Sequence, residues 1–187
     1  MIIEIPNFLP KTLQDYFESH LISSNFPWYF VKDVTFKNLE NTDYYKLGFY
    51  HIAFFNDIPQ TVIYDQLLFL PHYIKSVLNN PNLILNRIRC GMNVKSVDTC
   101  PHNSPHIDFD DEFPYKHYTC LYYVNDCDGD TFIFNEIKKS KKYTIKKRIS
   151  PEKGKLCIFD GEYYHASSNP NKSDYRIVIT TNLYEST

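Results

Sequence analysis

Two histidines and one aspartate stand in the order and spacing of a metal site. His106 and Asp108 flank Ile107, and His165 follows 57 residues after Asp108. Residues i and i+2 of a strand project to the same face, roughly 7 Å apart, so His106 and Asp108 could bind one ion together. Two imidazoles and a carboxylate on one face of an octahedron suit non-haem Fe(II), because the opposite positions stay open. The pattern therefore predicts an iron site with these three ligands.

An arginine follows the last of these ligands by eleven residues. Arg176 opens the apolar stretch 176–184, which reads as a strand. A guanidinium pairs with a carboxylate through two parallel hydrogen bonds and stays charged when it is buried. Beside an iron site, this fixed cation predicts a dicarboxylate co-substrate. Together the four residues indicate a 2-oxoglutarate-dependent oxygenase.

The elements that must position these residues read as one mainly β domain over residues 1–187. The high aromatic content, 17% of the chain, favours half-buried strands. In residues 1–80 we expect a strand at 2–5, a helix from Lys11 to about Ser23 with Thr12 as N-cap, a strand at 25–31, and a helix from Pro59 to about Leu78 that breaks near Pro71.

Residues 81–187 have a different sequence pattern, in which short aromatic or β-branched runs alternate with clusters of turn-forming residues. Seven strands are expected there, at 83–94, 104–109, 117–125, 130–136, 143–150, 155–160 and 176–184. Seven strands after two helices predict an α+β fold in which a β-barrel or double-sheet jelly roll carries the helices on one face.

Charge and cysteine content bear on partners and compartment. The formal net charge of -2 gives no general attraction to nucleic acid or to a membrane surface. The five cysteines lack CxxC spacing and cannot all pair, which favours reduced thiols. The N-terminus lacks the basic segment and long apolar core of a signal peptide, and no apolar run is long enough to cross a membrane. We therefore expect a cytoplasmic protein.

Residues 84–184 carry a longer series of motifs. After His106-x-Asp108 come HYTCLYYVN (117–125), DGDTF (128–132) and GKLCIFD (154–160), followed by His165 and Arg176. In this order the motifs resemble the prolyl-4-hydroxylase-like branch of the Fe(II)/2-oxoglutarate oxygenases, especially small stand-alone enzymes of bacteria and their phages. Those relatives typically carry Gly-Gly-Glu-Thr where this chain has Asp128-Gly129-Asp130-Thr131, a change that weakens the transfer of substrate identity.

The resemblance implies a double-stranded β-helix core with the N-terminal helices on one face. It implies Fe(II), 2-oxoglutarate and O₂ as reactants, with ascorbate as a candidate stimulant, and the decarboxylation of 2-oxoglutarate to succinate as an unactivated C–H bond is hydroxylated. The far carboxylate of 2-oxoglutarate would bind Arg176, with Tyr123 and Thr119 beside it.

The primary substrate stays open at this point. The resemblance favours a prolyl or related residue in a peptide or protein, and a free amino acid, nucleoside or other small metabolite is the alternative. A jelly roll that binds metal and 2-oxoglutarate without turnover is a third hypothesis, which the complete set of four residues argues against. A zinc hydrolase would leave Arg176 and Tyr123 without a role. The oligomeric state is not predicted.

Several further residues have both a functional and a structural interpretation. His102 is more readily a residue of the pocket rim than a ligand, and His117 a structural hydrogen-bonding group. Arg87 or Arg89 could contact substrate. The basic stretch 138–148 is more typical of a solvated hairpin than of an acidic partner's docking site. The segment around 110–114, within the loop 109–117, could form a lid, because it directly follows the metal pair.

Overall fold

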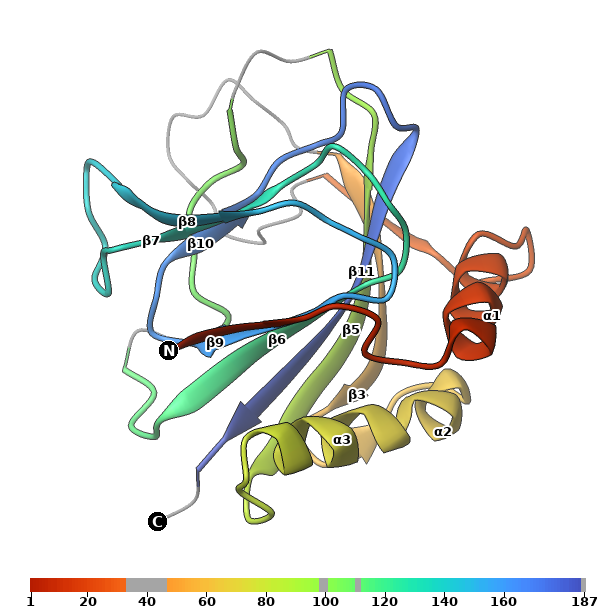
Figure 1. Ribbon diagram of the computed structural model, residues 1–187, viewed down its shortest axis with the longest axis horizontal. Coiled ribbons are helices and arrows are strands. Elements are labelled where there is room, and N and C mark those ends of the chain that lie inside the picture. The colour runs from red at the N-terminus through yellow and green to blue at the C-terminus, as the bar shows by residue number, and fades with distance from the viewer. Residues whose placement is uncertain (33–46, 98–100, 110–111, 186–187) are drawn as a thin grey trace.

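Two antiparallel sheets form most of the structure, a computed structural model that describes residues 1–32, 47–97, 101–109 and 112–185. The larger sheet has the strand order β1-β9-β6-β11-β5-β3-β2, with β4 beside β3, and the smaller has the order β10-β7-β8 (Figure 1). The strands are β1 (Ile2–Ile5), β2 (Tyr29–Val31), β3 (Gly48–Phe55), β4 (Ile58–Pro59), β5 (Ile84–Val94), β6 (His117–Tyr123), β7 (Thr131–Phe134), β8 (Ile145–Ile149), β9 (Leu156–Asp160), β10 (His165–Ser167) and β11 (Tyr175–Tyr184).

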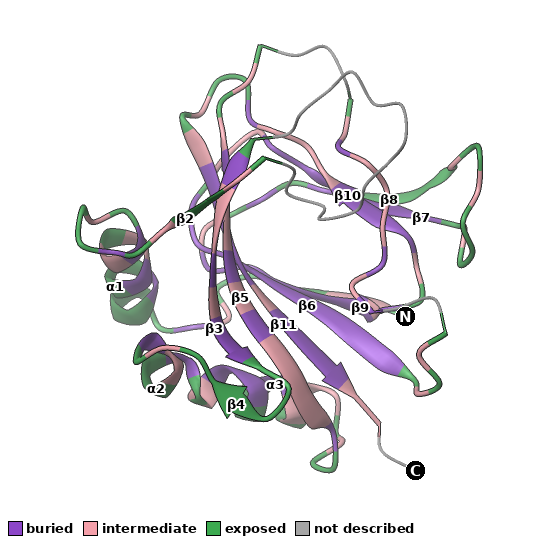
Figure 2. Cartoon of the chain, turned by 180° about the vertical axis from the view of Figure 1, so that it is seen from behind, coloured by how far each residue is buried: buried purple, intermediate pink, exposed green. Residues whose placement is uncertain are grey.

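The helices α1 (Lys11–Leu21), α2 (Ile63–Leu67) and α3 (Phe69–Val77) lie on one face of the larger sheet (Figure 1). They bury apolar side chains against the outward face of its central strands, in a cluster that includes Phe17, Leu70, Ile88, Tyr122 and Ile179. This packing covers one face of the sheet, and the second sheet covers part of the other. Every residue of β6 is therefore buried, as Figure 2 shows in purple.

A second apolar cluster fills the space between the two sheets. Leu121 and Tyr123 of β6 point into it, whereas Tyr122 points toward the helices, as the two-residue period of a strand requires. The other buried members are Ile133, Ile149, Cys157, Phe159 and Val178. The predicted mainly β fold with helices on one face is confirmed. The space between the sheets is where the predicted functional residues gather.

The helices differ from the sequence prediction in their ends. Pro10, not Thr12, is the N-cap of α1, and it makes no side-chain cap bond. The second predicted helix is two helices, and the break at Leu68 lies three residues before Pro71, near which it was expected. Pro71 has no N–H to donate to the carbonyl of Leu67, four residues earlier, so one continuous helix would lack this bond. Among the described residues, no helix is long and apolar enough to span a membrane.

Two of the predicted strands need correction. The strand predicted at 104–109 is wrong, because that segment makes one isolated bridge, His106 to His165. Pro101 and Pro105 lie just before the bridge and have no N–H to donate to a ladder. The strand predicted at 25–31 shortens to β2, after Pro27. The sequence analysis also missed β3 and β10, and β3 pairs with β5 beside the site described next.

Candidate active site

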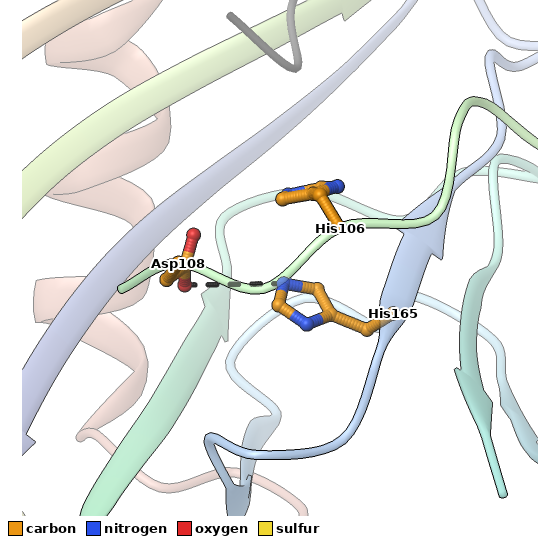
Figure 3. A group of neighbouring side chains, drawn as sticks. All are labelled: His106, Asp108 and His165. Carbon is orange, nitrogen blue, oxygen red and sulfur yellow. Dashed lines mark ion pairs between the residues drawn. The ribbon is translucent and has the colours of Figure 1, made fainter. Parts of the chain in front are cut away.

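His106, Asp108 and His165 come together between the two sheets. One nitrogen of each histidine and one oxygen of the aspartate all lie within 4.8 Å of one another (Figure 3). The bridge between the two histidines brings them together: the backbone N–H of each donates to the carbonyl of the other, at 3.0 and 2.9 Å. Asp108 stands two residues further on, so its carboxylate reaches Nε2 of His165 at 3.9 Å. The predicted convergence is present, although a bridge rather than a strand produces it.

The backbone fixes which ring nitrogens face one another. Nδ1 of His106 lies 3.2 Å from the carbonyl of Ser104, and Nδ1 of His165 lies 3.2 Å from the carbonyl of Tyr163. A carbonyl can only accept, so each Nδ1 carries the proton and each Nε2 keeps its lone pair. A carbonyl that accepts from the other ring nitrogen is the usual second contact of a metal-binding histidine.

The charges of the group suit a divalent cation. Burial, together with the neighbouring His165, lowers the pKa of His106 to about 3, so this ring is neutral at pH 7. Burial raises the pKa of Asp108, but Arg87 and the two histidines outweigh it and hold that pKa well below its usual range. Neutral imidazole and ionised carboxylate are the forms that bind metals. The donor set of two nitrogens and one oxygen therefore fits Fe(II).

Asp108 is surrounded by hydrogen-bond donors. Its Oδ1 accepts from Nη2 of Arg87 at 2.8 Å. Its Oδ2 accepts from Nδ2 of Asn182 at 2.8 Å and from Oγ1 of Thr119 at 3.1 Å. Thr119 therefore lies at the aspartate, and not beside Arg176 as the resemblance implied. The sequence analysis missed Asn182, and its partnership depends on the register between β6 and β11, which the sequence does not disclose.

Arg176 is buried at the other end of the same space. Its Nε donates to the carbonyl of Gly129 and its Nη2 to Oγ1 of Thr131, both at 2.8 Å. The hydroxyl of Tyr123 also donates to Thr131, and its ring lies 5.7 Å from the guanidinium carbon. Gly129 allows this approach, since a Cβ there would lie 3.0 Å from Cδ of Arg176. Two of the five guanidinium N–H groups are used in these bonds.

One pocket connects the two groups. It is open to solvent, and its empty space amounts to about 640 Å³ when the solvent at its mouth is included. Its lining includes His106, Asp108, His165, Thr131, Arg176, Gly91, Arg89, Leu121, Val178 and Thr180. Arg176, Val178 and Thr180 lie opposite Asn93, Gly91 and Arg89 in the β11–β5 ladder. The pocket floor is therefore one face of two paired strands. Thr131 is the residue here that sequence reasoning missed, although it closes the Asp-Gly-Asp-Thr motif quoted above.

The other histidines that the sequence singled out lie outside this group. Nδ1 of His102 lies 2.7 Å from the carbonyl of Asn103, and its ring packs on two phenylalanines. His117 is buried among the rings of Phe109 and Phe113, with Nδ1 2.9 Å from the carbonyl of Tyr115. Both histidines therefore contact backbone carbonyls and aromatic rings, apart from the group of His106, Asp108 and His165.

The two strand arginines and the basic hairpin are placed as follows. Arg87 binds Asp108, and Arg89 lines the pocket. In the stretch 138–148, Lys147 pairs with Glu4 and Arg148 with Asp130, and the lysines at its turn are exposed. Of the suggested lid, residues 110–111 lie outside the described residues.

Comparisons with known proteins agree with this geometry. Residues 93–184 match the family model of the 2OG-Fe(II) oxygenase superfamily. No curated protein sequence matches the chain. The solved structures that resemble it include an oxidoreductase of the 2OG-Fe(II) oxygenase family from Burkholderia pseudomallei. It is 10% identical with a TM-score of 0.71, and the match covers 98% of this chain and 84% of that one.

Two further similar structures differ in the reaction that their names give. A prolyl-4-hydroxylase from Pseudomonas putida is 13% identical with a TM-score of 0.60, and the match covers 100% of this chain and 93% of that one. The α-ketoglutarate-dependent epimerase SnoN, from nogalamycin biosynthesis, is 11% identical with a TM-score of 0.68, over 100% and 79%. At these identities the likeness shows the fold. With the family match over residues 93–184, which include His106, Asp108, His165 and Arg176, the chain belongs to the 2OG-Fe(II) oxygenase superfamily and is a 2-oxoglutarate-dependent Fe(II) oxygenase.

Proposed function

We propose that the protein hydroxylates an unactivated C–H bond of a prolyl or related residue in a peptide or protein. His106, Asp108 and His165 hold Fe(II) in this proposal, and Arg176 holds the far carboxylate of 2-oxoglutarate. Iron(II) bound there supplies the activation of O₂ that couples decarboxylation of 2-oxoglutarate to oxidation of the substrate. The observation that carries the proposal is the single pocket that contains both the three potential ligands and the buried guanidinium.

The residues around Arg176 support its assignment to the co-substrate. The hydroxyl of Thr131 receives hydrogen bonds from both Arg176 and Tyr123, so the guanidinium has a fixed position before any ligand arrives. Because the guanidinium is already fixed, the arginine loses little further side-chain entropy when a carboxylate binds it. Tyr123 then acts as a support of the arginine, with its ring against the guanidinium.

The apolar part of the pocket supports an oxidative role. Leu121 and Val178 line the space between the metal-binding group and Arg176, and both belong to the apolar cluster between the sheets. Such a lining limits water beside the reacting groups and prevents side reactions. The substrate would enter from the open side of the pocket.

The substrate class is the part that experiment must decide. The protein, loaded with Fe(II) and supplied with 2-oxoglutarate and O₂, is offered proline-containing peptides in one set of reactions and free amino acids and nucleosides in another. Succinate release is measured, and mass spectrometry looks for one added oxygen atom in the candidate substrate. We expect a peptide to stimulate release and to gain oxygen, and His165→Ala to abolish both.

Stimulation by a small metabolite, with none by any peptide, would contradict the prolyl assignment and favour the small-molecule alternative. That outcome would agree with the fold likeness to SnoN, whose name describes an epimerase from nogalamycin biosynthesis. No release with either class, from protein that binds Fe(II) and 2-oxoglutarate, would contradict the hydroxylase proposal in both forms.

A further inference from the structure

The carboxylate of Asp108 is held by side chains from three neighbouring strands. Arg87 of β5, Asn182 of β11 and Thr119 of β6 stand directly opposite one another in the sheet. Their side chains donate to Asp108 at 2.8, 2.8 and 3.1 Å. Asp108 itself lies outside the strands, so its backbone is not held by a ladder of its own. The three strand residues therefore provide the support that its backbone lacks.

Asn182 is the centre of this arrangement. Its Oδ1 accepts from Nε of Arg87 at 3.0 Å, and its Nδ2 donates to Asp108. The arginine thus determines which end of the amide faces the aspartate, because only the oxygen can accept from it. Asn182 is 1% exposed, and Arg87 retains 17% of its side-chain exposure. Both side chains are confined to one orientation by the surrounding protein.

The donors determine which oxygen of Asp108 faces the histidines. Oδ2 is the oxygen that lies 3.9 Å from Nε2 of His165, and it accepts hydrogen bonds from Asn182 and Thr119. Oδ1 accepts a hydrogen bond from Arg87. The three donors therefore hold the orientation of the carboxylate, and a metal shared with His165 would bind Oδ2, the oxygen that Asn182 contacts.

We propose that Asn182, oriented by Arg87, is a positioning residue that holds Oδ2 of Asp108 toward a divalent metal shared with His106 and His165. This inference rests on the metal site of the proposed function. It gives Thr119 a role at the metal ligand in place of the predicted role at 2-oxoglutarate. It also makes Arg87 a support of Asn182 and Asp108 rather than a contact of the substrate.

The test uses the full-length protein and Ni(II) or Co(II) as the probe. Asn182→Leu removes the donor at nearly constant size and without a change of charge. We expect it to weaken Ni(II) binding, measured calorimetrically, by about 10- to 100-fold, the usual effect of removing a partner of a metal ligand. The visible absorption of bound Co(II) should also change, because it reports the number and arrangement of ligand atoms.

Matched variants separate positioning from general loss of stability. Asn125 is also buried, and its side chain bonds only backbone groups in its recorded contacts. Asn125→Leu should lower the melting temperature and leave the Ni(II) affinity and the Co(II) spectrum as in the wild type. Thr119→Val should shift the Co(II) spectrum in the same direction as Asn182→Leu, and Thr119→Ser should restore it.

Unchanged Ni(II) affinity and an unchanged Co(II) spectrum in Asn182→Leu would overturn the inference while the metal site stood. A wild-type protein that binds neither ion would overturn the proposed metal site itself, and the inference with it. Should Asn182→Leu fail to fold, the same two measurements on Arg87→Lys test the inference instead. Lysine keeps the charge but lacks the fork that reaches both Asp108 and Asn182, so the spectrum should again change.

Discussion

Replacing Arg176 by methionine tests the co-substrate end of the pocket. Arg176 is 5% exposed, and its guanidinium is fixed by Gly129 and Thr131. Removing one member of a buried, hydrogen-bonded charge pair costs about 2–5 kcal/mol, which is about 30- to 4000-fold in affinity at about 1.4 kcal/mol per tenfold. Arg176→Lys keeps the charge but loses the paired N–H groups of the guanidinium. We expect this change to weaken the binding free energy of 2-oxoglutarate by about 1.5–3 kcal/mol.

The assay compares two ligands on protein loaded with Ni(II). One is 2-oxoglutarate, and the other is 2-oxopentanoate, in which a methyl group replaces the far carboxylate. We expect Arg176→Met to weaken binding of 2-oxoglutarate by the factor above and to leave 2-oxopentanoate nearly unaffected. Equal weakening of both ligands would refute the assignment, because the arginine would then act through the structure of the pocket and not through the carboxylate.

A control is needed because Arg176 also bonds the protein. Its loss removes two hydrogen bonds, at about 1 kcal/mol each, and leaves the carbonyl of Gly129 without this donor while Thr131 keeps the one from Tyr123. Thermal melting of each variant shows whether the protein remains folded under the binding conditions. Arg148→Met is the matched arginine control, since Arg148 pairs with Asp130 at an exposed position outside the pocket lining. It should leave the ratio of the two affinities unchanged.

Three further predictions concern the pocket floor and the stability of the fold. Gly91→Leu should fold, since the nearest atom to a Cβ there lies at 4.0 Å, and should block 2-oxoglutarate binding in calorimetry because Gly91 lines the pocket. Gly154→Ala should lower the melting temperature, because φ is +81° and a Cβ would lie 2.4 Å from the side chain of Gln14. Three backbone N–H groups outweigh burial and lower the pKa of Asp128 to about 2. The contribution of Asp128 to the free energy of unfolding is therefore fully present above the unfolded pKa of about 4 and is lost as the pH falls toward 2. In Asp128→Asn the free energy of unfolding should accordingly depend less on pH in this acidic range.

The residues of the candidate metal site were predictable because their order and chemistry are local. His106 and Asp108 are two residues apart, and His165 follows in the order that the family motif requires. The route by which they meet was predicted less well. A strand was expected at His106, whereas Pro105 and Pro101 leave one bridge to His165. The convergence depends on that contact between distant segments, and periodicity along the chain does not report it.

The partners of the functional residues were mostly beyond sequence reasoning. Thr119 was placed beside Arg176, but its strand position sets it opposite Asn182, next to Asp108. Alternation tells which face of a strand a side chain occupies, and the β6 residues divide between the two apolar clusters in this way. It does not tell which residue of the next strand stands opposite. That register is set by packing between strands far apart in sequence.

The central claim is that one pocket binds iron through His106, Asp108 and His165 together with 2-oxoglutarate. It is tested most directly by adding Fe(II) and then 2-oxoglutarate to the protein without oxygen and recording the visible metal-to-ligand charge-transfer band. The account predicts a band in the wild type that is absent in Asp108→Ala. A folded wild-type protein that binds Fe(II) and shows no band on addition of 2-oxoglutarate would contradict it.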